Sequence, residues 1–209
     1  MKALRNTLIV LVHSLAVIAT PAKAIKVERV VTDGGLNAWL VQDSTNPIIT
    51  LQLAFKGSAA LDPKQKLGLA NLAASTIDEG AGELSSQVFQ QTLEDHAIRM
   101  RFDAGIDNFG GRLQTLTRHR NKAFDLLRMA LTQPRFDPSP LERARAQILV
   151  KLKRNEESPQ SLANKALREA LYEDHPYGRP VIGTPKSVKA IKANDLRTFV
   201  EQRFARDNL

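Results

Sequence analysis

The stretch Gly68-Leu69-Ala70-Asn71-Leu72-Ala73-Ala74-Ser75-Thr76 sets the frame for the whole chain. Its apolar residues recur at helical spacing: Ala70 and Ala74 lie on one stripe, and Leu72 and Ala73 lie beside it. Because this stripe is broad, the spacing predicts a helix that is buried on most of its surface. Such a helix belongs to the interior of a domain and is packed by the elements that precede and follow it.

Three short segments before this helix have the pattern of strands. Clusters of turn-forming residues at positions 33–35 and 43–47 separate them. In the third segment Leu51, Leu53 and Phe55 alternate with other residues, which predicts one face packed on a core. We therefore expect an antiparallel meander at the start of the fold, formed by residues 27–31, 38–41 and 48–55.

The chain after the helix predicts two more strands and a series of helices. Residues 98–102 and 108–116 alternate as strands do, and Gly110-Gly111 within the second marks a bulge or a close backbone approach. The expected helices cover residues 85–96, 117–130, 139–156, 159–172, 185–191 and 194–204.

Several of these helices have recognisable start signals. In Asp137-Pro138-Ser139-Pro140-Leu141-Glu142, Ser139 is the expected N-cap, Pro140 takes the first helical position, and Glu142 completes a capping box. Other expected caps are Ser85 or Ser86, Thr117 and Asn194. In the helix after Ser85 the residues expected to point inward are Val88, Phe89 and Leu93.

The order of elements predicts the fold class. Three strands are followed by two helices, two strands and then several helices, so strands and helices do not alternate strictly. A doubly wound parallel sheet is therefore disfavoured. We expect an α+β fold, with helices packed on one face of a mostly antiparallel sheet. No internal repeat, low-complexity tract or linker divides residues 25–209.

Composition is consistent with such a domain. The chain has 209 residues, 43% of them apolar, which is enough for a sizeable core. It contains no cysteine, which excludes disulfides, zinc-thiolate sites and a cysteine nucleophile. The sequence has no Gly-x-Ser-x-Gly elbow, no phosphate-binding Gly-x-x-x-x-Gly-Lys loop and no dinucleotide fingerprint.

Residues 1–24 have the pattern of a secretory signal peptide. Lys2 and Arg5 precede an apolar run over residues 7–18, and Ala22-Lys23-Ala24 places small residues before a cut at Ile25. The alternative is that this segment stays as a membrane anchor. An exported chain without cysteine fits a bacterial periplasm, which is the expected location.

The charge of the chain is basic but mild. The net charge is +8, and the first 24 residues contribute three of these charges through Lys2, Arg5 and Lys23. Basic clusters follow at positions 118–122 and 143–154. Since aromatic residues are only 5% of the chain, we interpret these clusters as solvated helix faces and expect no nucleic-acid partner.

An ordered set of motifs makes the chain resemble the pitrilysin/insulinase-type (M16) peptidase family over residues 27–209. No single motif is specific, but their order and spacing together are. They are the opening hairpin, the strand 49–56 followed by Gly57-Ser58, the helix from Gly68-Leu69-Ala70, the turn Asp78-Glu79-Gly80, the segment 130–136, the helix with Arg143 and Gln147, His175-Pro176-Tyr177-Gly178, and Gly183-Thr184.

This resemblance implies a fold and a subunit organisation. The fold would be the first of two similar α+β halves of an M16 subunit, of the LuxS/MPP-like metallohydrolase type, here over residues 25–209. The family chain continues after a segment like 203–209 into a further strand and a second half. We therefore expect a fragment or a truncated product, whose sheet has an unpaired edge where that strand would lie.

In active members of the family the helix reads His-x-x-Glu-His, and here Asn71, Ala74 and Ser75 hold those three places. Two histidines one turn apart bind zinc, and the glutamate activates a metal-bound water. An amide, a methyl group and a hydroxyl replace all three groups. By the same resemblance the third-ligand glutamate falls near Lys151, a cation that would repel zinc. We predict no metal, no cofactor and no catalytic residue.

No substitute site is expected elsewhere. The histidines are His13 in the signal segment and His96, His119 and His175, which are far apart in the sequence and lack ligand spacing. Asp78 and Glu79 are two carboxylates without a third anchor, and we interpret them as turn and cap formers. His175 is expected to be a loop histidine, with a surface contact to a peptide or partner as the alternative.

The resemblance implies a catalytically inactive M16-like subunit. Some subunits of the family lack the zinc motif and pair with a zinc-bearing subunit around a chamber that holds a peptide. Two alternatives remain. One is a structural or assembly protein of the same fold, and the other is an active metallopeptidase with an unrecognised site. We expect no enzyme activity from the chain by itself and no membrane span after signal cleavage.

Overall fold

The computed structural model describes residues 26–209, which form two units. The expected signal segment lies outside these residues. The smaller unit, which ends at Ser44, is an antiparallel hairpin of β1 (Val27–Val31) and β2 (Asn37–Val41). Almost all of its residues are exposed, so the hairpin has no buried apolar face.

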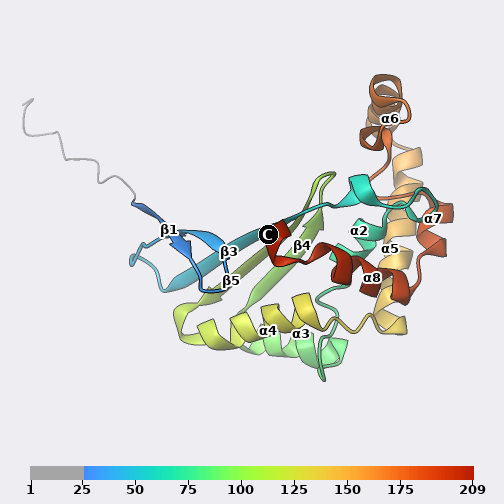
Figure 1. Cartoon of the computed structure of the whole chain (residues 1–209). Coiled ribbons are helices and arrows are strands. Elements are labelled where there is room, and N and C mark those ends of the chain that lie inside the picture. Colours follow the sequence, from blue (N-terminus) through green and yellow to red (C-terminus); the bar gives the residue numbers. More distant parts are fainter. Residues whose placement is uncertain (1–25) are drawn as a thin grey trace, which may run out of the picture. The chain divides into compact units, whose positions relative to one another are not determined.

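The larger unit, Thr45–Leu209, contains a three-stranded antiparallel sheet (Figure 1). Its strands are β3 (Ile48–Lys56), β4 (Arg99–Ala104) and β5 (Asn108–Leu116), in the order β3-β5-β4. The expected meander is therefore wrong, because β3 pairs with β5 and not with β2. The physical reason is burial: β3 and β5 together form an apolar face that the helices cover, whereas the hairpin has no such face to bury.

The two faces of this sheet differ in composition. Inward residues alternate with outward residues along each strand, as the pleat requires. The register from Ile48↔Leu116 to Lys56↔Asn108 is uninterrupted, so Gly110-Gly111 is no bulge. At Gly111 side chains and not backbone come close, since an added Cβ would lie 2.9 Å from the Leu53 side chain and 3.0 Å from the Phe102 ring. The inward face consists of Ile49, Leu51, Leu53, Phe55, Met100, Phe102, Phe109, Leu113 and Thr115.

Helices cover that inward face in two groups (Figure 1). One group is α3 (Ser86–Asp95) and α4 (Arg120–Thr132), which bury Phe89, Leu93 and Leu126 with the sheet. The other group forms the larger core with Phe55 and Phe109. Its helices are α2 (Leu69–Ala74), α5 (Pro138–Glu156), α7 (Pro185–Ala190) and α8 (Ala193–Arg203). The predicted α+β fold, with helices on one face of an antiparallel sheet, is confirmed.

One helix stays apart from both cores. Helix α6 (Pro159–Tyr172) has no buried residue, and its leucines at 162, 167 and 171 are exposed. Figure 1 shows it projecting from the end of α5. Among residues 26–209, no helix combines the length and apolar character needed to cross a membrane.

Helix boundaries show where local signals failed. Helix α5 begins at Pro138 with Asp137 as N-cap, so the prediction of Ser139 is wrong. Both Pro138 and Pro140 fit the first turn, because no intrahelical acceptor awaits their missing N–H groups. Helix α8 is capped by Lys192, not Asn194. Thr117 lies in a 3₁₀ turn before α4 and caps nothing.

The helix after Ser85 matches its prediction except at one residue. Ser85 is the N-cap and accepts from the Val88 N–H, and Phe89 and Leu93 are buried. Val88 itself is 48% exposed, so its predicted inward orientation is wrong. Val88 lies in the first turn of α3, on the side of the helix that faces solvent.

Candidate functional site

Helix α2 carries the degenerate motif and is positioned by two tight backbone contacts. Gly68, its N-cap, has φ 91, and a Cβ there would lie 2.7 Å from the carbonyl oxygen of Ile182. At Gly183, with φ +83, an added Cβ would lie even closer to a carbonyl oxygen, that of Leu67. Only glycine combines this left-handed conformation with so close an approach. The start of α2 is therefore fixed against the loop that precedes α7.

A buried carboxylate completes this helix start. Asp62 is 4% exposed and accepts hydrogen bonds from the N–H groups of Gly68 at 3.0 Å and Ala70 at 3.3 Å. These groups belong to the first turn, whose N–H groups have no intrahelical acceptor. Burial raises the pKa of Asp62 to about 6, against the opposing effects of the backbone N–H groups and of Arg203.

Asp62→Asn is expected to change how stability depends on pH. An unfolded aspartate releases its proton near pH 3.8, whereas folded Asp62 holds it up to about pH 6. As pH rises between these values, the unfolded state has fewer bound protons, so the wild type loses stability, by at most about 3 kcal/mol. The asparagine of the variant keeps an oxygen acceptor but does not titrate, so the variant lacks this loss of stability with rising pH. Urea unfolding of both proteins at pH 4 and pH 7 measures it. A difference in unfolding free energy that does not change with pH contradicts the assignment.

The three motif positions lie where the helical frame predicts. Asn71 is partly exposed, Ala74 is 8% exposed, and Ser75 is exposed at the C-cap of α2. The Ser75 hydroxyl donates to the Asn71 carbonyl oxygen at 2.9 Å, so positions 71 and 75 are one turn apart on one face. The face has the spacing of a two-histidine zinc site, but the groups present do not fit zinc.

The residue at the position expected for the third zinc ligand does not restore a zinc site. Lys151 is an exposed residue of α5, and α2 and α5 contribute to the same core. Within residues 26–209, no three histidine, cysteine, aspartate or glutamate side chains are grouped so that they could hold a metal ion. That the chain binds no zinc remains a prediction.

The structure brings two histidines together that the sequence spacing had separated. His96 is the C-cap of α3 and His119 is the N-cap of α4, and their rings meet edge to face with centroids 5.1 Å apart. Arg118 donates to Nε2 of His119 at 3.0 Å. Partial burial, Arg118 and His96 all lower the pKa of His119. The cation beside the pair makes it a poor metal site.

His175 is a loop histidine, as predicted. Its Nδ1 accepts a hydrogen bond from the N–H of Tyr177 at 3.3 Å, and its ring meets the ring of Tyr177 edge to face. The hydroxyl of Tyr177 donates to Asp107 at 2.8 Å, and this bond raises the pKa of Tyr177. Tyr177, which His175 contacts, thus joins the loop before α7 to the turn between β4 and β5.

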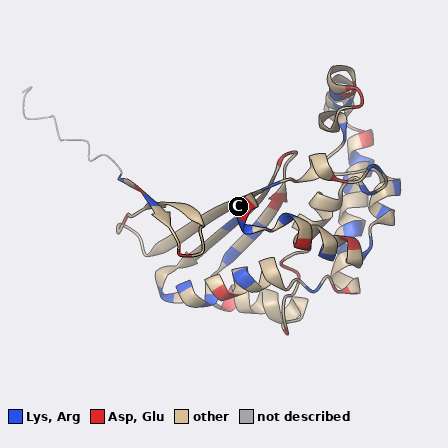
Figure 2. Ribbon diagram, viewed as in Figure 1, with Lys and Arg blue, Asp and Glu red and all other residues tan. Residues whose placement is uncertain are grey.

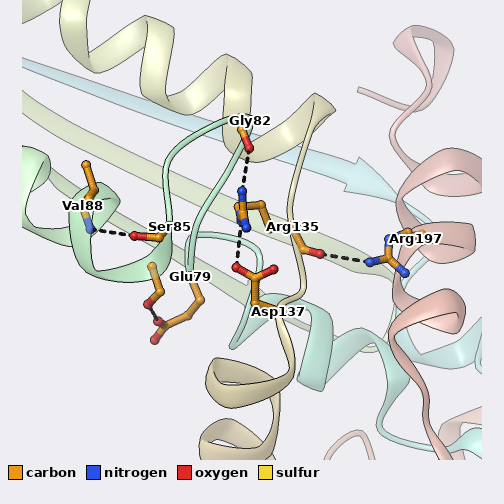
Figure 3. Close-up of polar contacts among 8 residues, drawn as sticks. Glu79, Gly82, Ser85, Val88, Arg135, Asp137 and Arg197 are labelled. Atoms are coloured by element: carbon orange, nitrogen blue, oxygen red, sulfur yellow. Dashed lines mark hydrogen bonds and ion pairs between the residues drawn. The ribbon is translucent and has the colours of Figure 1, made fainter.

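Glu79, in the turn after α2, has two side-chain partners. It accepts from the Ser86 hydroxyl at 2.5 Å, the bond drawn at Glu79 in Figure 3. It also pairs with Arg143 at 2.7 Å, so these contacts link the turn after α2 to α3 and α5. Burial, with a smaller contribution from the charge of Glu79, raises the pKa of Asp78 to about 6. Because Glu79 is already engaged, it is not available as a metal ligand. Both residues lie in the turn after α2, as interpreted, but neither caps a helix, since the C-cap of α2 is Ser75 and the N-cap of α3 is Ser85.

The same figure shows a second polar link at the start of α5. Arg135 donates to Asp137 at 2.7 Å and to the Gly82 carbonyl oxygen at 3.3 Å, and its own carbonyl oxygen accepts from Arg197 of α8 at 3.2 Å (Figure 3). These contacts join the turn after α2 to α5 and α8. Polar contacts therefore connect the elements around the motif helix into one scaffold.

Comparison with known proteins identifies this scaffold. Residues 38–185 match the family model for insulinase (peptidase family M16). The chain belongs to peptidase family M16. The resemblance seen in the ordered motifs is thus confirmed.

The curated M16 relatives include a protein named for lacking activity. The chain is 32% identical over 160 residues to the non-peptidase homolog YmxG of Helicobacter pylori, covering 77% of this chain and 36% of that protein. It is 27% identical over 117 residues to the mitochondrial-processing peptidase subunit beta of Saccharomyces cerevisiae, covering 50% of this chain and 25% of that protein. The chain therefore spans only about a third or less of the length of these relatives.

Solved M16 structures give the same answer for the fold. The inactive peptidase M16 domain from Pseudomonas fluorescens aligns with a TM-score of 0.82 and 25% identity, over 88% of this chain and 45% of that one. Pitrilysin aligns with a TM-score of 0.76 and 16% identity, over 90% of this chain and 21% of that one. The relatives with which this chain shares the M16 fold thus include a protein named a non-peptidase homolog and a structure named an inactive domain.

Proposed function

We propose that this chain is the non-catalytic partner of a zinc-bearing M16 peptidase subunit, with which it encloses a peptide in the bacterial periplasm. The observation that carries the proposal is the contrast within α2. Its backbone frame, glycine contacts and Asp62 cap are complete, while Asn71, Ala74 and Ser75 replace every group that zinc catalysis needs. Selection that keeps a scaffold without its chemistry favours a role in binding and assembly.

The sheet beside this helix supports a peptide-binding role. Strand β4 pairs only with β5 among the strands of residues 26–209, so its other edge has free N–H and C=O groups. Helix α2 packs against β4. An extended peptide can add to such an edge by main-chain hydrogen bonds, and its side chains then alternate between the two faces of the sheet. This edge is where we place the peptide.

Mixing this chain with a zinc-bearing M16 subunit from the same genome is expected to raise peptidase activity by about tenfold or more, because a second wall positions the peptide for attack. The measurement is cleavage of a quenched fluorescent peptide by each protein alone and by the mixture. As the control, the partner's catalytic glutamate is replaced by glutamine, and activity must disappear.

Two outcomes of this experiment contradict the proposal. Zinc-dependent cleavage by this chain alone would make it a peptidase. A stable complex whose cleavage rate equals that of the partner alone would make it a structural or assembly protein. Size-exclusion chromatography of the mixture separates this second outcome from a simple failure to associate.

A further inference from the structure

The face of the sheet opposite the helices carries an unbalanced positive charge. Its outward residues include Arg99 and Arg101 of β4, Arg112 of β5 and Lys56 of β3, all of them exposed. Figure 2 shows basic residues along these strands. The acidic side chain of the same face is Asp103. Four cations therefore share this face with one carboxylate.

Two of these arginines lie directly opposite each other. Arg101 pairs with Arg112 across β4 and β5, and Arg99 lies one pair further along the same face. Side chains of directly opposed residues approach to about 5 Å between Cβ atoms, and like charges at that spacing destabilise a sheet. The strands thus hold a repulsive pair on an exposed face.

No carboxylate relieves this repulsion. Within residues 26–209, none of the ion pairs includes Lys56, Arg99, Arg101 or Arg112. Asp103 lies over Gly110, where an added Cβ would be 2.7 Å from its carboxylate oxygen. Asp103 is opposite Gly110, which is the next outward-facing pair after Arg101 and Arg112, so its carboxylate lies beside this pair and not between the two arginines.

We propose that this basic face, together with the free edge of β4, selects an extended peptide with acidic side chains at alternate positions. A strand added to β4 places every second side chain on the same face as Arg99 and Arg101. Carboxylates there form charge-assisted, bidentate contacts with guanidinium groups. Next to Asp103 the peptide favours a neutral or basic residue. The inference names the substrate class of the proposed peptide-binding role and in that respect rests on it.

The chemistry of the face favours a peptide over a nucleic acid. Single-stranded nucleic acids need aromatic side chains on which bases stack, as well as cations. The outward residues of the three strands contain no aromatic ring. The residues of this face besides the four cations and Asp103 are Ile48, Thr50, Gln52, Ala54, Asn108, Gly110, Gln114 and Leu116.

Fluorescence anisotropy with the full chain alone tests the proposal. The probes are labelled ten-residue peptides that carry glutamate, glutamine or lysine at alternate positions. We expect the glutamate peptide to bind about tenfold or more tightly than the glutamine peptide, and the lysine peptide not to bind. Arg101→Gln with Arg112→Gln is expected to remove most of this preference. Arg154→Gln with Arg168→Gln, on exposed arginines of α5 and α6, changes net charge equally and is expected to leave it intact.

Folding is controlled in the same variants. Because Arg101→Gln with Arg112→Gln relieves repulsion, its thermal midpoint is expected to equal or exceed that of the wild type. Arg101→Glu with Arg112→Glu is expected to bind the lysine peptide instead.

Each of the following results overturns the proposal: equal binding of the glutamate and glutamine peptides, equal losses in both arginine double variants, or binding of none of the peptides. Tighter binding of a single-stranded oligonucleotide, lost in the Arg101 and Arg112 variant, would assign the face to nucleic acid. These assays contain no partner subunit, so the peptidase mixing experiment fails or succeeds separately.

Discussion

The triple variant Asn71→His, Ser75→His and Lys151→Glu is expected to bind one zinc ion with micromolar or tighter affinity, about −8 kcal/mol, whereas the wild type binds none. The Ser75 N–H donates to the Asn71 carbonyl oxygen at 3.1 Å, so histidines at these positions project from one helical face. A glutamate on the neighbouring α5 supplies the third ligand in place of a cation. Ala74, which is part of the core, stays unchanged because its family counterpart is a base and not a ligand.

Zinc content after dialysis, measured by mass spectrometry, and competition with a chromophoric chelator give this affinity. The matched control, Asn71→His with Ser75→His, keeps Lys151 and is expected to bind at least about tenfold more weakly, since two histidines beside an ammonium group make an incomplete site. Stoichiometric zinc in the wild type that survives dialysis and disappears in Asn71→Ala would contradict the absence of a native site.

Gly183→Ala is expected to destabilise the fold by about 3 kcal/mol or more, because it combines a left-handed backbone with a backbone clash. Gly183 has φ +83, and an added Cβ would lie 2.2 Å from the carbonyl oxygen of Leu67, which precedes α2. Neither backbone segment is free to move, since Ser187 donates to that same carbonyl oxygen at 2.7 Å. Urea unfolding followed by circular dichroism measures the loss.

Gly57→Ala is the matched control for this prediction. Gly57 has almost the same backbone angle, φ +85, but its nearest neighbour is the end of the Leu61 side chain at 3.0 Å, which is free to rotate away. Its expected cost is therefore the conformational penalty alone, about 1–2 kcal/mol. Equal losses in the two variants would show that the contact between residues 67 and 183 does not hold the start of α2.

Elements with strong local signals were predicted closely from the sequence. Strand β5 covers the predicted residues 108–116, and α6 covers the predicted residues 159–172. An alternating pattern and a proline at the first helical turn act over a few residues, so no distant contact is needed to read them. The degenerate motif was likewise found from its own residues and the resemblance, because its frame is a single helix.

Features that depend on distant residues were missed or wrong. The partner of β3 is β5, more than 50 residues later, because the paired residues run from Ile48 with Leu116 to Lys56 with Asn108, whereas the sequence order suggested β2. His96 and His119 were considered too far apart, yet the ends of α3 and α4 bring their rings together. The cap of α2 by Asp62 and the opposition of Arg101 and Arg112 were also missed, since both depend on how the chain folds back on itself.

Residue identity alone therefore determined that the motif is altered, with Asn71, Ala74 and Ser75 in place of the two histidines and the glutamate of active members. The loss of zinc binding that we expect from these groups stays a prediction. Periodicity likewise determined that this helix is buried and that the fold is α+β. Only the tertiary structure decided what surrounds the helix: the glycine contacts, the Asp62 cap and the row of uncompensated arginines. The reason is that strand register and loop closure depend on the packing of the entire core. A pattern over a few neighbouring residues does not encode which residues distant in the sequence are brought together.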